Sequence, residues 1–162
     1  MQIEICSKLV GAAASKDLVT VSPTTKLEDV AALFEKEKVN AAPVVDGFGK
    51  CIGIITSSDL VHYESIRSSF NEEFKHGIAF ELSRDINNES FGIFGKPFDE
   101  VAYHMSTEIQ CIEESASLTD AGRKMCQNNI HHLLILDDAN RPCGMLSSLD
   151  LVREMLNECD PS

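Results

Sequence analysis

The sequence has few basic residues, no long apolar run and no basic start. It contains 14 Lys and Arg against 26 Asp and Glu in 162 residues, which gives a formal net charge of −12 at pH 7. Nucleic acid polymers and anionic membranes are bound by basic surfaces, so this charge argues against both as partners. No stretch approaches the roughly 18 consecutive apolar residues that cross a membrane, and the apolar part near the N-terminus is too short for a secretion signal. We therefore expect a cytoplasmic protein.

Closely spaced cysteines and the common catalytic motifs are also missing. No CxxC pair occurs, so the spacing supports neither a zinc site nor a disulfide framework, and we expect reduced, mostly buried thiols. There is no GxSxG elbow, P-loop lysine motif, HExxH helix or glycine-rich dinucleotide fingerprint. We expect no enzymatic activity, no required cofactor and no metal site. The cysteines are Cys6, Cys51, Cys111, Cys126, Cys143 and Cys159.

An internal repeat is the main feature that the sequence does contain. GIITSSDL at residues 53–60 returns as GMLSSLDL at residues 144–151. A shift of 91 residues aligns 18–62 with 109–153 without a gap, with eight identical positions and many conservative exchanges. Two copies are too few for a solenoid, so we expect two units that pack against each other as a pair.

Each copy predicts the same order of elements, β-α-β-β-α. Short strand-like segments, LVTV and IQCI, come first. A helix follows, with Thr25 and Glu28 or Ser117 and Asp120 in capping-box spacing. Two apolar runs joined by a turn then predict a hairpin, and a closing helix follows. In the first copy this helix is long and meets a stop signal at Lys75, His76 and Gly77.

The element order, the apolar runs that end in Asp (PVVD, LILD) and the repeated glycine-to-aspartate motif resemble a stand-alone pair of cystathionine-β-synthase (CBS) domains. AYHMS at 102–106 resembles the lead-in to the second unit, and the resemblance covers roughly 105 residues. It implies an α/β fold with two units related by a pseudo-two-fold axis. It also implies clefts that hold AMP, ADP, ATP or S-adenosylmethionine, and a homodimer. We place the first unit with its lead-in at 1–65, an aromatic-rich insert at 66–101 and the second unit at 102–162.

The motif has two possible roles. A helix that starts at the hydroxyl and aspartate offers unpaired N–H groups to an anion, and the hydroxyls of Thr56, Ser58 and Ser147 are further donors. Asp59 and Asp150 can each accept from the two hydroxyls of a ribose. The alternative is that these side chains only cap the helices, which stabilises a helix by about 1 kcal/mol without any ligand.

The resemblance also implies which residues face each motif across the pair. Site one would combine Thr56, Ser58, Asp59, Cys111, Ile112, His131 and His132. Site two would combine Ser147, Asp150, Thr20, Val21, Asn40 and Ala41. We expect site one to be the better site, because two imidazoles there can donate to a phosphate, and more strongly as the pH falls. The adjacent histidines point to opposite faces of a strand, so metal binding is the weaker alternative.

Basic residues are scarce around these positions, so AMP, adenosine or S-adenosylmethionine fits the sequence better than ATP. The insert at 66–101 holds six of the eight phenylalanines, which predicts a folded segment. It either packs locally and contributes to a dimer or forms a lid over the cleft. The leading functional prediction is a regulatory sensor of an adenosyl ligand that acts through its dimer or an unknown effector protein. The alternative is a structural dimerisation module with empty clefts.

Overall fold

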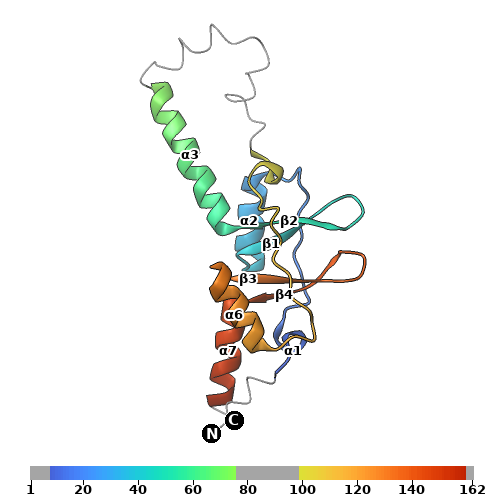
Figure 1. The fold of residues 1–162 in the computed structure, drawn as a ribbon. Helices are drawn as coiled ribbons and strands as arrows, with labels where there is room; N and C mark the ends of the chain where they lie inside the picture. The colour runs from blue at the N-terminus through green and yellow to red at the C-terminus, as the bar shows by residue number, and fades with distance from the viewer. Residues whose placement is uncertain (1–7, 76–98, 160–162) are drawn as a thin grey trace.

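The computed structural model describes residues 8–75 and 99–159 (Figure 1). The first unit contains α2 (Leu27–Glu37), β1 (Ala41–Val45), β2 (Cys51–Thr56) and α3 (Ser57–Lys75). The second contains α6 (Leu118–Asn128), β3 (His132–Leu136), β4 (Pro142–Ser147) and α7 (Ser148–Cys159). Apart from the ends of the closing helices, every bound is shifted by 91 residues, as the sequence repeat predicts. The lid or dimer surface predicted within 66–101 falls largely outside the described residues.

The hairpins are confirmed, whereas the first strand of each unit is shorter than predicted. Antiparallel β1 and β2 set Ala41 opposite Thr56, and β3 and β4 set His132 opposite Ser147 in the equivalent register. The segments LVTV and IQCI contribute only isolated parallel bridges, from Val21 to Val44 and from Cys111 to Leu134. Each segment therefore lies along the outer edge of its hairpin, beside β1 or β3.

One of the two residues predicted to start a capping box caps its helix. Ser117 caps α6, since its Oγ accepts from the Asp120 N–H at 3.0 Å and donates to Asp120 Oδ2 at 2.7 Å. The Thr25 prediction is wrong: α2 starts after Lys26, which makes no side-chain cap. Thr25 Oγ1 instead accepts from the Ser22 N–H, so its hydroxyl is used in the turn before the helix.

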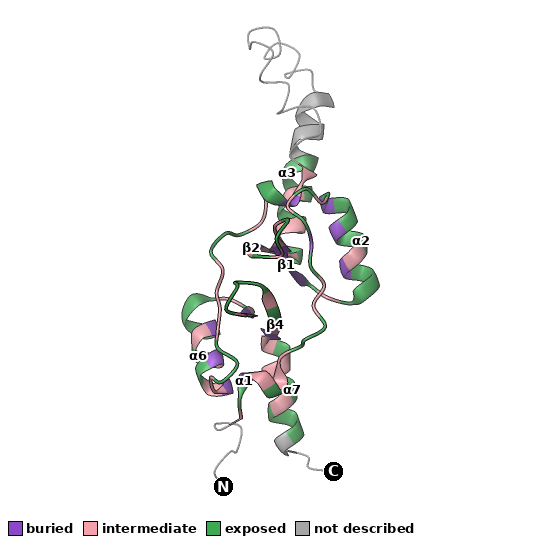
Figure 2. Cartoon of the chain, turned by 90° about the vertical axis from the view of Figure 1, so that its right-hand side faces the viewer, coloured by how far each residue is buried: buried purple, intermediate pink, exposed green. Residues whose placement is uncertain are grey.

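The core consists of two clusters, one for each unit, and Figure 2 shows the buried residues on the inner faces of the elements. In the first, the buried face of α2 packs against β1 and β2 through residues that include Leu27, Val30, Val44 and Ile55. The second is built in the same way from α6, β3 and β4. This packing follows from the apolar spacing along each helix.

Each lead-in completes the core of the other unit. Val10 in α1 (Val10–Ala13) is fully buried in the second cluster, and Val101 in the 3₁₀ helix η3 (Val101–Tyr103) is fully buried in the first. The backbones of Ser15 and Met145 exchange hydrogen bonds, as do those of Ser106 and Ile54. These pairs are also related by the shift of 91, so the structural repeat begins at least eight residues earlier than the aligned sequence.

The exchange of lead-ins holds the two units side by side. Figure 1 shows the two hairpins stacked, with their turns projecting to the same side. The Cys51 N–H donates to the Asn140 carbonyl at 2.9 Å and joins the hairpins directly. Within the part of the chain that the structure describes, no helix has the length and apolar character of a membrane span.

Candidate functional site

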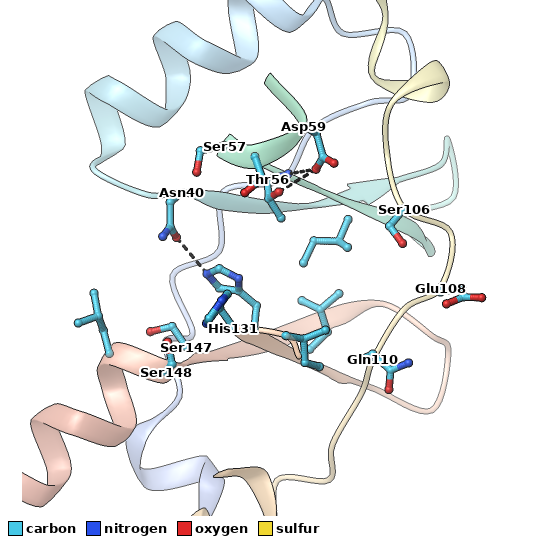
Figure 3. A pocket seen from close by; sticks show the side chains of 16 residues that line it. Asn40, Thr56, Ser57, Asp59, Ser106, Glu108, Gln110, His131, Ser147 and Ser148 are labelled. Atoms are coloured by element: carbon cyan, nitrogen blue, oxygen red, sulfur yellow. Dashed lines mark hydrogen bonds between the residues drawn. The ribbon is translucent and has the colours of Figure 1, made fainter. Parts of the chain in front are cut away.

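A cavity of about 400 Å³ lies between the two units (Figure 3). Thr56 and Asp59 lie on the first-unit side, and His131 and Ser147 on the second-unit side. The lead-in to the second unit runs along one side and contributes three polar residues, Ser106, Glu108 and Gln110. Apolar surface comes from Ile54, Ile130 and Leu134. We call this space cleft one.

A second cavity of about 350 Å³ occupies the equivalent place on the other side of the pair. It is lined by the first lead-in (Ser15, Asp17, Leu18, Val19), by the segment after α2 (Lys38, Val39, Asn40, Ala41) and by the second motif and helix α7 (Ser147, Leu149, Asp150, Arg153). We call it cleft two. Four residues line both clefts and so form the wall between them: Asn40, His132, Ser147 and Leu149.

The structure brings most of the predicted site residues together. Thr56, Ser58, Asp59, His131 and His132 all line cleft one. Asn40, Ala41, Ser147 and Asp150 all line cleft two.

The predicted first-strand residues lie just outside the clefts. Val21 is buried in the first core, and Cys111 is bridged to Leu134. Neither these two nor their neighbours Thr20 and Ile112 are among the residues that line either cleft. The chain borders the clefts one to four residues earlier, at 17–19 and 108–110, before it turns into the sheet. Leu18, Val19 and Gln110 lie within the aligned ranges, and Asp17 and Glu108 lie one residue before them.

In cleft one the motif forms the cap that the alternative interpretation predicts. Asp59 Oδ2 accepts from the Thr56 N–H at 2.7 Å and from Thr56 Oγ1 at 2.8 Å (Figure 3). Both bonds use the same oxygen, and Asp59 Oδ1 accepts no hydrogen bond from the described residues. The aspartate therefore caps α3 and retains one oxygen for a further donor.

In cleft two the aspartate uses both oxygens. Asp150 Oδ2 accepts from the Ser147 N–H at 2.8 Å and from Ser147 Oγ at 2.6 Å. Asp150 Oδ1 accepts from Arg153 Nη1 at 2.7 Å. The position equivalent to Arg153 in the first unit is His62, so this third contact has no counterpart in cleft one. A ribose that approached Asp150 would compete with Arg153.

His132 lies in the wall between the clefts. Its Nε2 is 3.0 Å from Asn40 Oδ1, the bond that Figure 3 draws from Asn40 across the two units. Because the amide oxygen only accepts, Nε2 carries the proton and Nδ1 of the neutral ring is an acceptor. Burial lowers the pKa of His132, the neighbouring His131 lowers it further, and Asp150 partly offsets both. The imidazole is therefore a poorer cationic phosphate donor than the sequence predicts.

The charges that line the two clefts differ. Among the described residues that line cleft one, the carboxylates are those of Asp59 and Glu108, and there is no Lys or Arg. Cleft two contains Asp17 and Asp150 together with Lys38 and Arg153. The expectation that basic residues are scarce around both sites is therefore wrong for cleft two. Lys38 was missed because it ends α2 in a left-handed conformation, a position that spacing along the helix does not reveal.

Residues 8–75 and 99–159 give little support for a metal site or a reactive thiol. No group of three His, Cys, Asp or Glu side chains there is arranged to hold a metal ion. The four cysteines whose side chains are described, Cys51, Cys111, Cys126 and Cys143, are free, and none is fully buried, which corrects the expectation of mostly buried thiols. Partial burial raises the pKa of the Cys51 and Cys111 thiols, so both are less reactive than an exposed cysteine.

Comparisons with known proteins agree with this geometry. The chain is 27% identical over 150 residues to the uncharacterized protein MJ1225 of Methanocaldococcus jannaschii; this covers 91% of the chain but only 49% of the relative. The structure superposes on CBSX2 of Arabidopsis thaliana in complex with AMP, with a TM-score of 0.67, 23% identity and coverage of 94% of this chain and 98% of the other. It also superposes on the CBS domain pair of protein MJ0100 in complex with 5′-methylthioadenosine and S-adenosyl-L-methionine, with a TM-score of 0.65, 23% identity and coverage of 90% and 94%.

The family model for the CBS domain matches residues 10–65 and 99–157, one match for each structural unit including its lead-in. The two matches together span most of the sequence. The chain belongs to the CBS domain family.

Proposed function

We propose that the chain is a regulatory module that binds an adenosyl ligand between its two units and transmits the bound state through a dimer or an effector protein. The observation that carries this proposal is that Asp59 lines the cleft and that its Oδ1 accepts no hydrogen bond from the described residues. A carboxylate oxygen in this position matches the diol of a ribose. The AMP complex of CBSX2 and the two adenosyl compounds held by the MJ0100 domain pair support the same ligand class.

The rest of cleft one suits a nucleoside. Its volume of about 400 Å³ lies within the range of pockets that bind small molecules. Ile54, Ile130 and Leu134 offer apolar surface to a base, while the Ser58 hydroxyl and the start of α3 offer donors. We place the ribose at Asp59 and the base against the apolar residues.

Exposed apolar residues on the closing helices suggest the surface through which the bound state is transmitted. On α7, Leu149 is 64%, Val152 49% and Leu156 63% exposed, and on α3, Val61 is 71% exposed. Exposed apolar stripes of this kind mark protein interfaces. Leu149 belongs to this stripe and also lines both clefts, so a ligand that moves it changes the stripe directly. We propose that a second copy of the chain packs on this face.

Thermal unfolding of the purified protein with AMP, ADP, ATP, adenosine or S-adenosylmethionine tests the proposal. A ligand at a hundred times its dissociation constant stabilises the fold by about 2.7 kcal/mol, which raises the midpoint of a chain of this size by roughly 5–10 °C. For a ligand that binds cleft one, the increase should disappear in Asp59→Ala. Asp120→Ala is the matched control, since the Asp120 carboxylate also accepts from the hydroxyl three residues earlier, that of Ser117, but lines neither cleft.

The alternative function is a structural dimerisation module. One observation favours it: both aspartates already close a helix cap, so the motif is satisfied without a ligand. Absence of any thermal shift in nucleotide-free protein would support this alternative. The cytoplasmic location and the lack of enzymatic activity remain predictions from the sequence. Turnover of an adenosyl compound would contradict the second of them.

A further inference from the structure

We infer that the two clefts select ligands by charge: cleft two takes an adenosyl ligand that carries a phosphate, and cleft one takes an adenosyl ligand that is uncharged or cationic. This inference rests on the proposed function and assigns a ligand class to each cleft. It comes from comparing the charged residues at positions that the repeat makes equivalent.

Cleft one is acidic. Its charged lining consists of Asp59 and Glu108, and Glu108 makes no ion pair with any described residue. The pKa of the nearby His132 is lowered by burial, so this imidazole adds no positive charge at neutral pH. A phosphate dianion in this cleft would meet two carboxylates and no fixed cation. A sulfonium or ammonium group would meet two opposite charges.

Cleft two has the same number of carboxylates, Asp17 and Asp150, but adds two cations. Arg153 is paired with Asp150 at 2.7 Å. Lys38 makes no ion pair with a described residue, so its ammonium group remains available to an incoming anion. The lining of cleft two is therefore formally neutral, whereas the two charged residues of cleft one are both carboxylates.

The repeat shows where the difference arises. Asp17 and Glu108 are equivalent, so both clefts keep an acidic residue from the lead-in. Lys38 is equivalent to Asn129, and Arg153 is equivalent to His62. The asymmetry is thus confined to two positions where one copy has a cation and the other does not. Lys38 and Asn129 share a left-handed backbone, with φ of 55° and 52°, and asparagine adopts this conformation more readily than lysine, so Lys38→Asn adds no backbone strain.

The test is calorimetric titration of the full chain with AMP, adenosine and S-adenosylmethionine at low salt. Lys38→Asn gives cleft two the asparagine that the second copy has at the equivalent position, and Glu108→Gln removes a negative charge from cleft one. We expect Lys38→Asn to weaken AMP binding about fivefold, roughly the value of one partly exposed charge contact, and to leave adenosine and S-adenosylmethionine unchanged. Glu108→Gln should weaken S-adenosylmethionine binding and leave AMP binding in cleft two unchanged.

Two further variants complete the experiment. Lys36→Asn removes a cation from α2 that lines neither cleft, so it reports the effect of net charge alone. Asn129→Lys places a cation beside cleft one and should add AMP binding there. Equal responses of AMP and adenosine to Lys38→Asn would overturn the charge assignment and leave the proposed function intact. If none of the three compounds binds the unmodified chain, both proposals fail.

Discussion

Asn40 of the first unit and His132 of the second are joined by a hydrogen bond of 3.0 Å, and both residues line both clefts. The two clefts therefore share a wall whose central contact crosses from one unit to the other. A ligand that displaces either side chain changes the boundary of the neighbouring cleft. We therefore expect binding at the two sites to be interdependent.

Asn40→Ala should affect both clefts, unlike substitutions in the individual motifs. Removing the amide leaves the partly buried His132 without this acceptor and costs about 1 kcal/mol of stability. We expect the affinities for AMP and for S-adenosylmethionine to change together in Asn40→Ala. Titration calorimetry measures both affinities. A change at one cleft only would show that the wall does not couple them.

The pH dependence of stability should include a contribution from His132. Its pKa is lowered in the folded chain by burial, so the unfolded chain takes up the proton more readily. The contribution is fully present above the unfolded pKa of about 6.5 and is lost as the pH falls below that value toward the lowered folded pKa. Urea unfolding between pH 5 and 8 gives the free energy of unfolding at each pH. This free energy should change less with pH in His132→Gln than in the unmodified chain.

The control for this measurement is His62→Gln, which alters an exposed histidine that lines neither cleft. If the two variants give the same slope, burial of His132 does not contribute to the pH dependence.

The exchanged lead-ins should make the two units unfold together. Val10→Ala removes buried apolar volume from the second core, and Val101→Ala removes it from the first. Each substitution should cost about 2 kcal/mol. Because each lead-in belongs to one unit in sequence and to the other in space, both variants should lower a single common midpoint. Resolved transitions for the two units, measured by calorimetry, would contradict this expectation.

The glycine that begins the first motif should tolerate no side chain. A Cβ at Gly53 would lie 2.9 Å from the Ser106 carbonyl oxygen and 2.8 Å from Met105 Sδ, and Ser106 is held there by its hydrogen bonds to Ile54. At Gly144 the close neighbour is the side chain of Ile135, which has more freedom to move. Gly53→Ala should therefore destabilise the fold by about 1–3 kcal/mol, and more than Gly144→Ala does. Chemical denaturation of both variants gives the comparison.

Much of the fold was predictable because each helix and strand is predicted twice, once in each copy of the repeat. A hairpin or helix suggested by one copy is supported by the other, and the shift of 91 carries the bounds of α2, β1 and β2 onto α6, β3 and β4. The position of the motif beside a cleft was predictable for the same reason. A helix start next to a strand end leaves polar groups at the edge of the sheet.

The features that escaped prediction depend on contacts between distant segments. Val10 and Val101 are apolar residues in short segments. Nothing in the local sequence shows that Val10 packs in the second unit and Val101 in the first. Lys38 reaches cleft two only because the chain turns in a left-handed conformation at the end of α2. The bridges at Val21 and Cys111 place the adjacent lead-ins, rather than the predicted strand residues, along the clefts.

The crossed lead-ins also bear on how such a molecule can arise from a single ancestral unit. One unit alone carries a lead-in that does not pack on its own core, as Val10 and Val101 show. Two identical units would satisfy each other by exchanging these segments, which is the geometry of a domain-swapped dimer. Joining two copies in tandem turns that dimer into one chain without changing its contacts. The two linked copies can then diverge, so that Lys38 and Asn129 came to differ within one shared architecture.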